Sequence, residues 1–68
     1  MLHDAKKFSD AQLLDAIETV SRLMAADAIR IERNWDAQST ENAQYWYEKR
    51  KPHLINYCQE YLRRNQNG

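Results

Sequence analysis

The side chains best able to carry chemistry are one cysteine, two histidines and a short aromatic and basic stretch. Cys58 and His53 are a possible nucleophile and base, but at five residues apart they lie on different faces of a helix. The spacing of His3, His53 and Cys58 matches no CxxC or HxxxH pair of a zinc site. No glycine precedes position 68, so no glycine-rich loop can hold a phosphate. The sequence therefore predicts a protein without enzymatic activity, metal or cofactor.

The densest group of binding side chains begins in the stretch YWYEKRKPH, which runs from Tyr45 to His53. On a helical projection, the aromatic and basic residues of this region and of the turns after it share one flank. The candidate partner-binding residues are Trp46, Lys49, Arg50, His53, Tyr57 and Arg64. Trp, Tyr and Arg are enriched in the hot spots of protein interfaces, and the same types can stack bases and neutralise phosphates. A third interpretation is structural, with the aromatic residues at the edge of the core and the arginines in solvent.

The charge pattern weakens the nucleic-acid interpretation. The chain carries ten basic and ten acidic residues, so no net field attracts it to a polyanion. The basic residues near the flank are spread around the helix, with Glu48 and Glu60 among them. The sequence thus favours a small adaptor, inhibitor or regulatory protein that binds a larger protein. A dimeric nucleic-acid-binding regulator, using Trp46, Arg50, His53, Tyr57 and Arg64, is the alternative.

These side chains need a helical scaffold, and the stretch from Ser9 to Trp35 predicts its main element. This stretch contains no Gly or Pro, and Ser9 with Gln12 three residues later has the pattern of a capping box. Its apolar residues recur at steps of three and four, within about an 80° arc of an α-helix. These core and dimer candidates are Leu13, Ile17, Val20, Met24, Ala28, Ile31 and Trp35.

Asp27 lies within the flank of this apolar stripe. Its carboxylate could reach the rim of the core and pair with Arg30, three residues further on. It could also stay buried and fix the register of the helix or the choice of its partner. The sequence leaves both interpretations open.

The second helical region is expected from Thr40 to about Asn65. Asn34 could take the left-handed conformation that ends the first helix, and Ser39 or Thr40 could cap the second. Pro52 lacks a backbone N–H and clashes with the preceding turn, so we expect a kink or a split there. The predicted fold is an all-α antiparallel helical hairpin with its second helix kinked or split at Pro52, or alternatively a three-helix bundle.

The length of 68 residues predicts one small helical domain, with residues 1–8 and 66–68 frayed. A chain of this size has little net stability, and a lone cysteine cannot form an intrachain disulfide. Residues 1–36 hold five basic and seven acidic residues, whereas residues 37–68 hold five and three. This asymmetry suits two antiparallel helical segments, or two copies of the chain, lying side by side. We therefore expect a homodimer with a four-helix-like bundle.

The sequence also predicts a cytoplasmic location with no membrane contact. No apolar run approaches the roughly 20 residues of a membrane span. The N-terminus, MLHDAKKF, lacks the apolar centre of a signal peptide.

Overall fold

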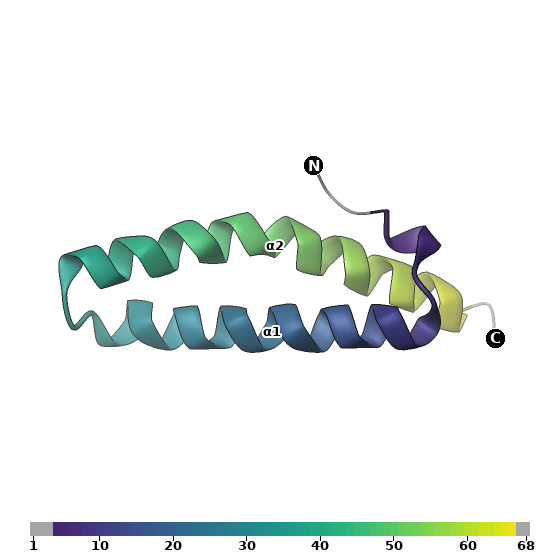
Figure 1. The fold of residues 1–68 in the computed structure, drawn as a ribbon, viewed down its shortest axis with the longest axis horizontal. Helices are drawn as coiled ribbons and strands as arrows, with labels where there is room; N and C mark the ends of the chain where they lie inside the picture. The colour runs from purple at the N-terminus through teal and green to yellow at the C-terminus, as the bar shows by residue number, and fades with distance from the viewer. Residues whose placement is uncertain (1–3, 67–68) are drawn as a thin grey trace.

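The computed structural model describes residues 4–66, which form helices and no strands. A short 3-10 helix, η1 (Ala5–Lys7), precedes two long helices, α1 (Asp10–Arg33) and α2 (Ala37–Gln66). Figure 1 shows α1 and α2 side by side, joined by a short connection at one end, with η1 beside α2 at the other end. The predicted all-α class is confirmed, and the arrangement is consistent with a helical hairpin.

Helix α1 begins and ends where its local signals predict. The Gln12 backbone N–H donates to the Ser9 hydroxyl at 3.1 Å, and the Ser9 N–H donates to the Gln12 side-chain oxygen at 2.9 Å. At the other end, Asn34 adopts the left-handed conformation (φ 49°), and its N–H donates to the Arg30 carbonyl. These contacts satisfy backbone groups that a helix end otherwise leaves unpaired.

The connection to α2 is shorter than predicted. Helix α2 begins at Ala37, three residues before the expected start at Thr40. Asp36 supplies the N-cap pattern, because its carboxylate accepts the Ser39 backbone N–H at 2.8 Å. The predicted capping by Ser39 or Thr40 is therefore corrected. The Thr40 hydroxyl instead lies 2.9 Å from the Asn34 side-chain oxygen, which joins the two ends of the connection.

Pro52 does not divide the second helical region. Helix α2 continues through Pro52 to Gln66, so the three-helix version is wrong for residues 4–66. A proline inside a helix costs about 3 kcal/mol. The Pro52 ring is exposed, whereas Ala43 before it and Tyr57 after it are both buried. A continuous helix lets residues on both sides of the proline pack in the core. This packing outweighs the one backbone hydrogen bond that Pro52 cannot make.

The core lies between α1 and α2 near η1. Leu13 is 0% exposed, and Ala5 and Tyr57 are buried in the same cluster. Phe8 packs against this cluster, with its ring centroid 5.7 Å from that of Tyr57. Side chains from α1, α2 and the N-terminal segment thus share one small core.

The predicted apolar stripe of α1 is buried unevenly. Its members fall into three groups: buried Leu13 and Met24, half-buried Ile17, Val20 and Ile31, and exposed Ala28 and Trp35. Trp35 is 73% exposed because the chain leaves the helix at Asn34, so Trp35 no longer follows the helical projection of the stripe.

The N-terminal segment is more ordered than expected for residues 4–8. Asp4 caps η1 by accepting the Lys6 backbone N–H at 3.1 Å, and Ala5 is buried. The frayed end predicted for residues 1–8 therefore does not describe residues 4–8. Residues 1–3 and 67–68 lie outside the described part of the chain, and Gln66 is the last residue of α2.

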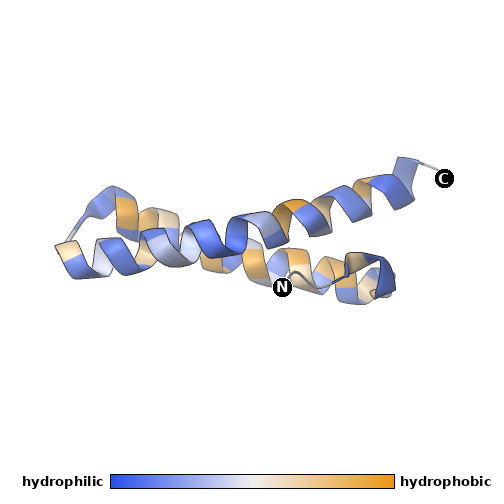
Figure 2. Ribbon diagram, turned by 90° about the horizontal axis from the view of Figure 1, so that it is seen from above, coloured by the Kyte–Doolittle hydropathy of each residue, from blue (hydrophilic) through white to orange (hydrophobic). Residues whose placement is uncertain are grey.

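Two packed helices form one elongated layer. The described chain measures 46 × 22 × 16 Å, with a radius of gyration of 14.0 Å. A compact domain of this length has a radius of gyration of about 11 Å. Figure 2 shows that α2 is largely hydrophilic near the connection, with hydrophobic bands in its second half.

Replacing the best-buried side chain should test this core. We expect Leu13→Ala to lower the free energy of unfolding by about 2–5 kcal/mol, because it leaves a cavity between the helices. Urea unfolding followed by circular dichroism measures this change. Leu23→Ala is the matched control, since Leu23 is exposed on the same helix. Equal losses for the two variants would contradict the assigned core.

Candidate interaction surface

A buried carboxylate links α1 to α2. Asp27 is 3% exposed, and Arg50 of α2 donates to its Oδ2 at 2.7 Å. Arg30, one turn further along α1, lies 3.4 Å from its Oδ1. The predicted contact with Arg30 is therefore made, but Asp27 is buried rather than at the rim. A paired, buried charge of this kind can fix the register of two helices.

Trp46 extends this cluster to the surface. The Arg50 guanidinium lies over the Trp46 ring, 5.2 Å from its centroid, and Tyr45 meets the same ring edge-on at 5.2 Å. The Lys49 Nζ lies 5.4 Å from the centroid of the Tyr45 ring. Trp46 is nevertheless 50% exposed. Two neighbours thus contact the Trp46 ring while half of the residue stays exposed to solvent.

A recess of about 390 Å³ opens beside Trp46. Six of its eight lining residues are polar or charged, among them Asp27, Arg30, Asp36 and Asn42, and the other two are Ala43 and Trp46. The surface therefore combines one oriented aromatic ring with one polar hollow, and we call the two together the Trp46 surface.

The predicted partner-binding flank separates into two clusters. Trp46, Lys49 and Arg50 stay together at the Trp46 surface. Tyr57 is buried against Phe8, and the His53 ring lies 6.4 Å from the Tyr57 ring. The N-terminal segment therefore occupies the side of α2 that the helical projection left open.

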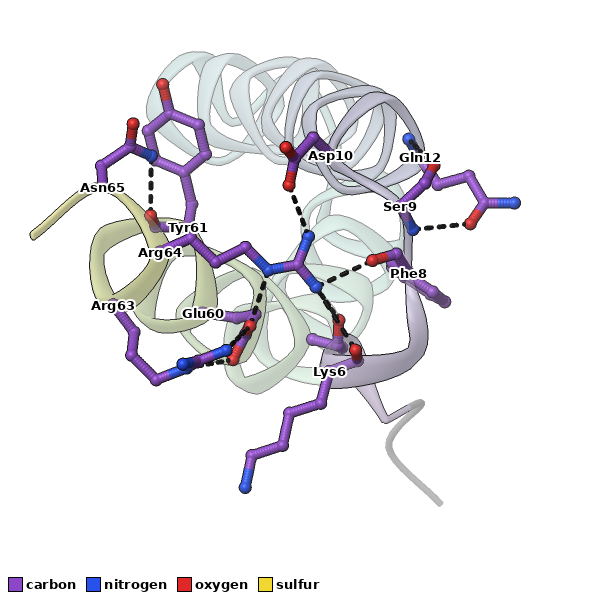
Figure 3. A network of polar contacts seen from close by, with 11 residues as sticks. Lys6, Phe8, Ser9, Asp10, Gln12, Glu60, Tyr61, Arg63, Arg64 and Asn65 are labelled. Carbon is purple, nitrogen blue, oxygen red and sulfur yellow. Dashed lines mark hydrogen bonds and ion pairs between the residues drawn. The ribbon is translucent and has the colours of Figure 1, made fainter. Parts of the chain in front are cut away.

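Arg64 joins the N-terminal segment to both helices (Figure 3). Its guanidinium donates to Asp10 at 2.8 Å and to Glu60 at 2.7 Å. It also donates to the backbone carbonyls of Phe8 at 2.8 Å and Ala5 at 3.2 Å, and it lies 3.4 Å from that of Lys6. Planar guanidinium groups suit several acceptors at once. This single side chain connects η1, the start of α1 and the end of α2.

Two arginine neighbours stabilise the ionised form of Glu60. Arg63 donates to Glu60 Oε1 at 3.0 Å, and Arg64 donates to Oε2 at 2.7 Å. The hydrogen bonds from Arg63 and then Arg64 lower the pKa of Glu60 from 4.5 to about 2, although burial acts in the opposite direction. The same hydrogen bonds raise the pKa of both guanidinium groups.

Sequence reasoning found some of these contacts and missed others. The pairing of Glu60 with Arg64 follows from their spacing of four residues in a helix. The contacts of Arg50 with Asp27 and of Arg64 with Asp10 join residues 23 and 54 positions apart. No local pattern marks such pairs, because they depend on how α2 lies along α1.

Within residues 4–66, no group of three or more His, Cys, Asp or Glu side chains is placed to bind a metal ion. Cys58 is half-buried on α2. Neither long helix has a stretch of the length and apolar character needed to cross a membrane.

Comparisons with protein-family models, with curated proteins and with solved structures give no match to this chain.

Acid should weaken the fold through Glu60. A carboxyl group whose pKa is lower in the folded chain stabilises the fold above about pH 4.5, and this contribution is lost as the pH falls towards 2. The difference in urea midpoint between the wild type and Glu60→Gln should therefore be large at about pH 6 and small at about pH 2.5. A difference that does not change with pH would contradict this role.

Arg64 should control the order of the N-terminal segment. Arg64→Gln removes the donor to three backbone carbonyls, so exchange of the Phe8 amide hydrogen should accelerate by about tenfold or more. Arg63→Gln is the matched control, since Arg63 also binds Glu60 but Figure 3 shows no interaction between Arg63 and the N-terminal segment. The exchange rates are measured by NMR. Equal Phe8 exchange rates in the two variants would contradict this role of Arg64.

Proposed function

We propose that this protein is a non-enzymatic interaction module that binds a larger protein through the Trp46 surface and acts as a homodimer. In this proposal, the helical hairpin blocks or bridges a surface of its partner. It therefore acts by occupying a surface of its partner, as an adaptor, an inhibitor or a regulatory protein does.

The arrangement of Trp46 carries the proposal. Arg50 and Tyr45 hold the ring, and half of the side chain is exposed next to a polar recess. An aromatic anchor loses little conformational entropy on binding when its orientation is already set. Trp, Tyr and Arg, which are grouped here, are also the residue types most enriched in interface hot spots.

The wide exposure of apolar side chains supports the homodimer. Nine large hydrophobic side chains in the described residues are exposed. A two-helix layer buries only the stripe along which its helices touch, so the outer apolar residues stay in water. Association with a second copy would cover part of them and supply stability that one small core does not.

The positions of the arginines favour a protein partner over nucleic acid. Arg50 binds Asp27, and Arg64 binds both Asp10 and Glu60. Phosphate binding depends on cationic groups that can replace released counterions. Arginines already neutralised by carboxylates contribute less to such binding. Near Trp46, Arg50 contacts both the Trp46 ring and the Asp27 carboxylate, whereas Lys49 lies over the Tyr45 ring.

Half-buried Cys58 supports the non-enzymatic part of the proposal. A nucleophilic cysteine needs exposure and a nearby group that favours its thiolate form. Cys58 is half-buried, and the His53 ring is grouped with Tyr57, one position before Cys58 on α2. Successive helical residues point about 100° apart, so Cys58 points away from the side of Tyr57. The side chains of Cys58 and His53 therefore do not converge on one site.

Removing the anchor should weaken partner binding. The partner is first isolated by affinity capture and purified, and its dissociation constant is then measured by calorimetry. We expect Trp46→Ala to weaken binding by about 30-fold or more, the loss typical of a hot spot. Trp35→Ala is the control, because Trp35 is also exposed but lies outside the Trp46 surface.

Three results would count against this proposal. Trp46→Ala could bind like the wild type, or Trp35→Ala could lose as much affinity. A mobility shift with DNA or RNA that disappears steeply with added salt would support the nucleic-acid alternative instead. Arg50→Ala is a poor test, because it would leave the Asp27 carboxylate buried without its closest partner.

A further inference from the structure

We propose that a second recess between α1 and α2 binds an arginine side chain of a partner protein. The residues that line this recess are Ala28, Ile31, Glu32, Gln44, Tyr47 and Glu48, and we call it the acidic recess. It shares no lining residue with the recess beside Trp46. The inference depends neither on the Trp46 surface nor on the homodimer, so it can be tested separately from the proposed function.

The acidic recess opens on a different side of the two helices from Trp46. On α1, Ala28 follows Asp27, which lines the recess beside Trp46. On α2, Tyr47 likewise follows Trp46. Successive helical residues point about 100° apart, so each helix contributes a separate strip of its surface to each recess. A side chain that fills the acidic recess therefore leaves the Trp46 surface open.

Glu32 and Glu48 bring negative charge to this recess, one from each helix. Both residues are exposed, and within residues 4–66 neither forms an ion pair. None of the described residues that line the recess is basic. Asp27 in the recess beside Trp46 differs, because Arg30 and Arg50 already bind it. The acidic recess therefore carries carboxylates that can accept a cation from outside the chain.

The apolar part of the recess suits the stem of a long basic side chain. Ala28 and Ile31 of α1 and Tyr47 of α2 supply this part of the lining. Ile31 and Tyr47 are half-buried, whereas Glu32 and Glu48 are exposed. Long basic side chains lay their methylene groups on apolar surface and keep the charged group at its edge. The recess thus offers surface of the right kind to both parts of such a side chain.

The lining favours arginine over lysine. A guanidinium group is planar, can donate to several carboxylate oxygens and can stack on an aromatic ring. Here the acceptors come from two helices, and Tyr47 supplies a ring in the same lining. A lysine ammonium is a compact and strongly hydrated charge, so it gains less from a site of this form.

The bound arginine should come from another protein, because the arginines of this chain already have partners. Arg33 lies over the Trp35 ring, and the others bind carboxylates: Arg22, Arg30, Arg50, Arg63 and Arg64. If Arg50 or Arg64 entered the recess of a second copy, a buried carboxylate would lose one of its donors, which is costly.

An NMR titration of the full chain with n-butylguanidinium, a mimic of the arginine side chain, tests the recess. We expect saturable shifts of the Glu32, Gln44 and Glu48 backbone amides, with a dissociation constant of about 20 mM or tighter for so small a ligand. n-Butylurea has the same shape without the charge and should give no saturable shift. Guanidinium alone lacks the stem and should bind at least about threefold more weakly.

Removing both carboxylates should weaken this binding. We expect Glu32→Gln combined with Glu48→Gln to raise the dissociation constant by about threefold to tenfold, the range for two exposed ion pairs. Asp15→Asn combined with Glu41→Gln is the matched control. It removes the same charge from the same two helices at exposed residues outside the recess, so its dissociation constant should stay within about twofold of the wild type.

Several results would overturn the inference. The shifts could rise linearly and spread equally to Asp15 and Glu41, n-butylurea could bind as tightly as n-butylguanidinium, or both double variants could lose equal affinity. Sedimentation equilibrium tests the source of the arginine. A dimer that persists in the control but dissociates in the Glu32 and Glu48 variant would assign the recess to a second copy instead of another protein. None of these measurements involves Trp46, so the Trp46→Ala test of the proposed function stands or fails independently.

Discussion

Two helices packed side by side can bury only the stripe along which they touch, and the rest of this structure follows from that limit. Leu13 is the fully buried large side chain in the described residues, and it lies where the N-terminal segment adds a third wall to the two helices. Elsewhere the layer has two solvent-facing sides. The described residues therefore leave nine large hydrophobic side chains exposed, which is the physical basis for proposing that the protein works by association.

Ion pairs fix part of the helix alignment that a larger apolar core would otherwise fix. Asp27 and Arg50 join the helices nearer the connection, and Glu60 and Arg64 organise the opposite end. Buried ion pairs add little net stability compared with apolar packing, but each is costly to leave unpaired. Their main effect here is therefore on geometry. They penalise alternative alignments of α2 on α1, in which a buried carboxylate would lose its arginine.

The sequence predicted the features that depend on neighbouring residues. The capping box at Ser9 and the left-handed Asn34 both follow from side chains within four positions of the helix end. The start of α2 was misplaced because Asp36, Ser39 and Thr40 can all cap a helix, and the local sequence does not rank them. Of the two alternatives at Pro52, the split does not occur, because α2 continues through this residue despite its local helix-breaking character.

The candidate surface was harder to predict than the fold. A helical projection grouped Trp46 with Tyr57 and Arg64, but it could not show that residues 5–8 fold back over part of that flank. The sequence also predicted only part of the Trp46 surface. The contact between Trp46 and Arg50 follows from their spacing, whereas the recess and Asp27 come from the facing helix and the connection.

The left-handed turn at Asn34 has a consequence for the order of folding. Contacts near this turn join residues close in sequence, such as Thr40 with Asn34, whereas Arg64 with Asp10 closes a loop of more than fifty residues. Closing a short loop costs less chain entropy than closing a long one. The helices should therefore make their first contacts near Asn34, and the arginine-bound end should be the last to assemble.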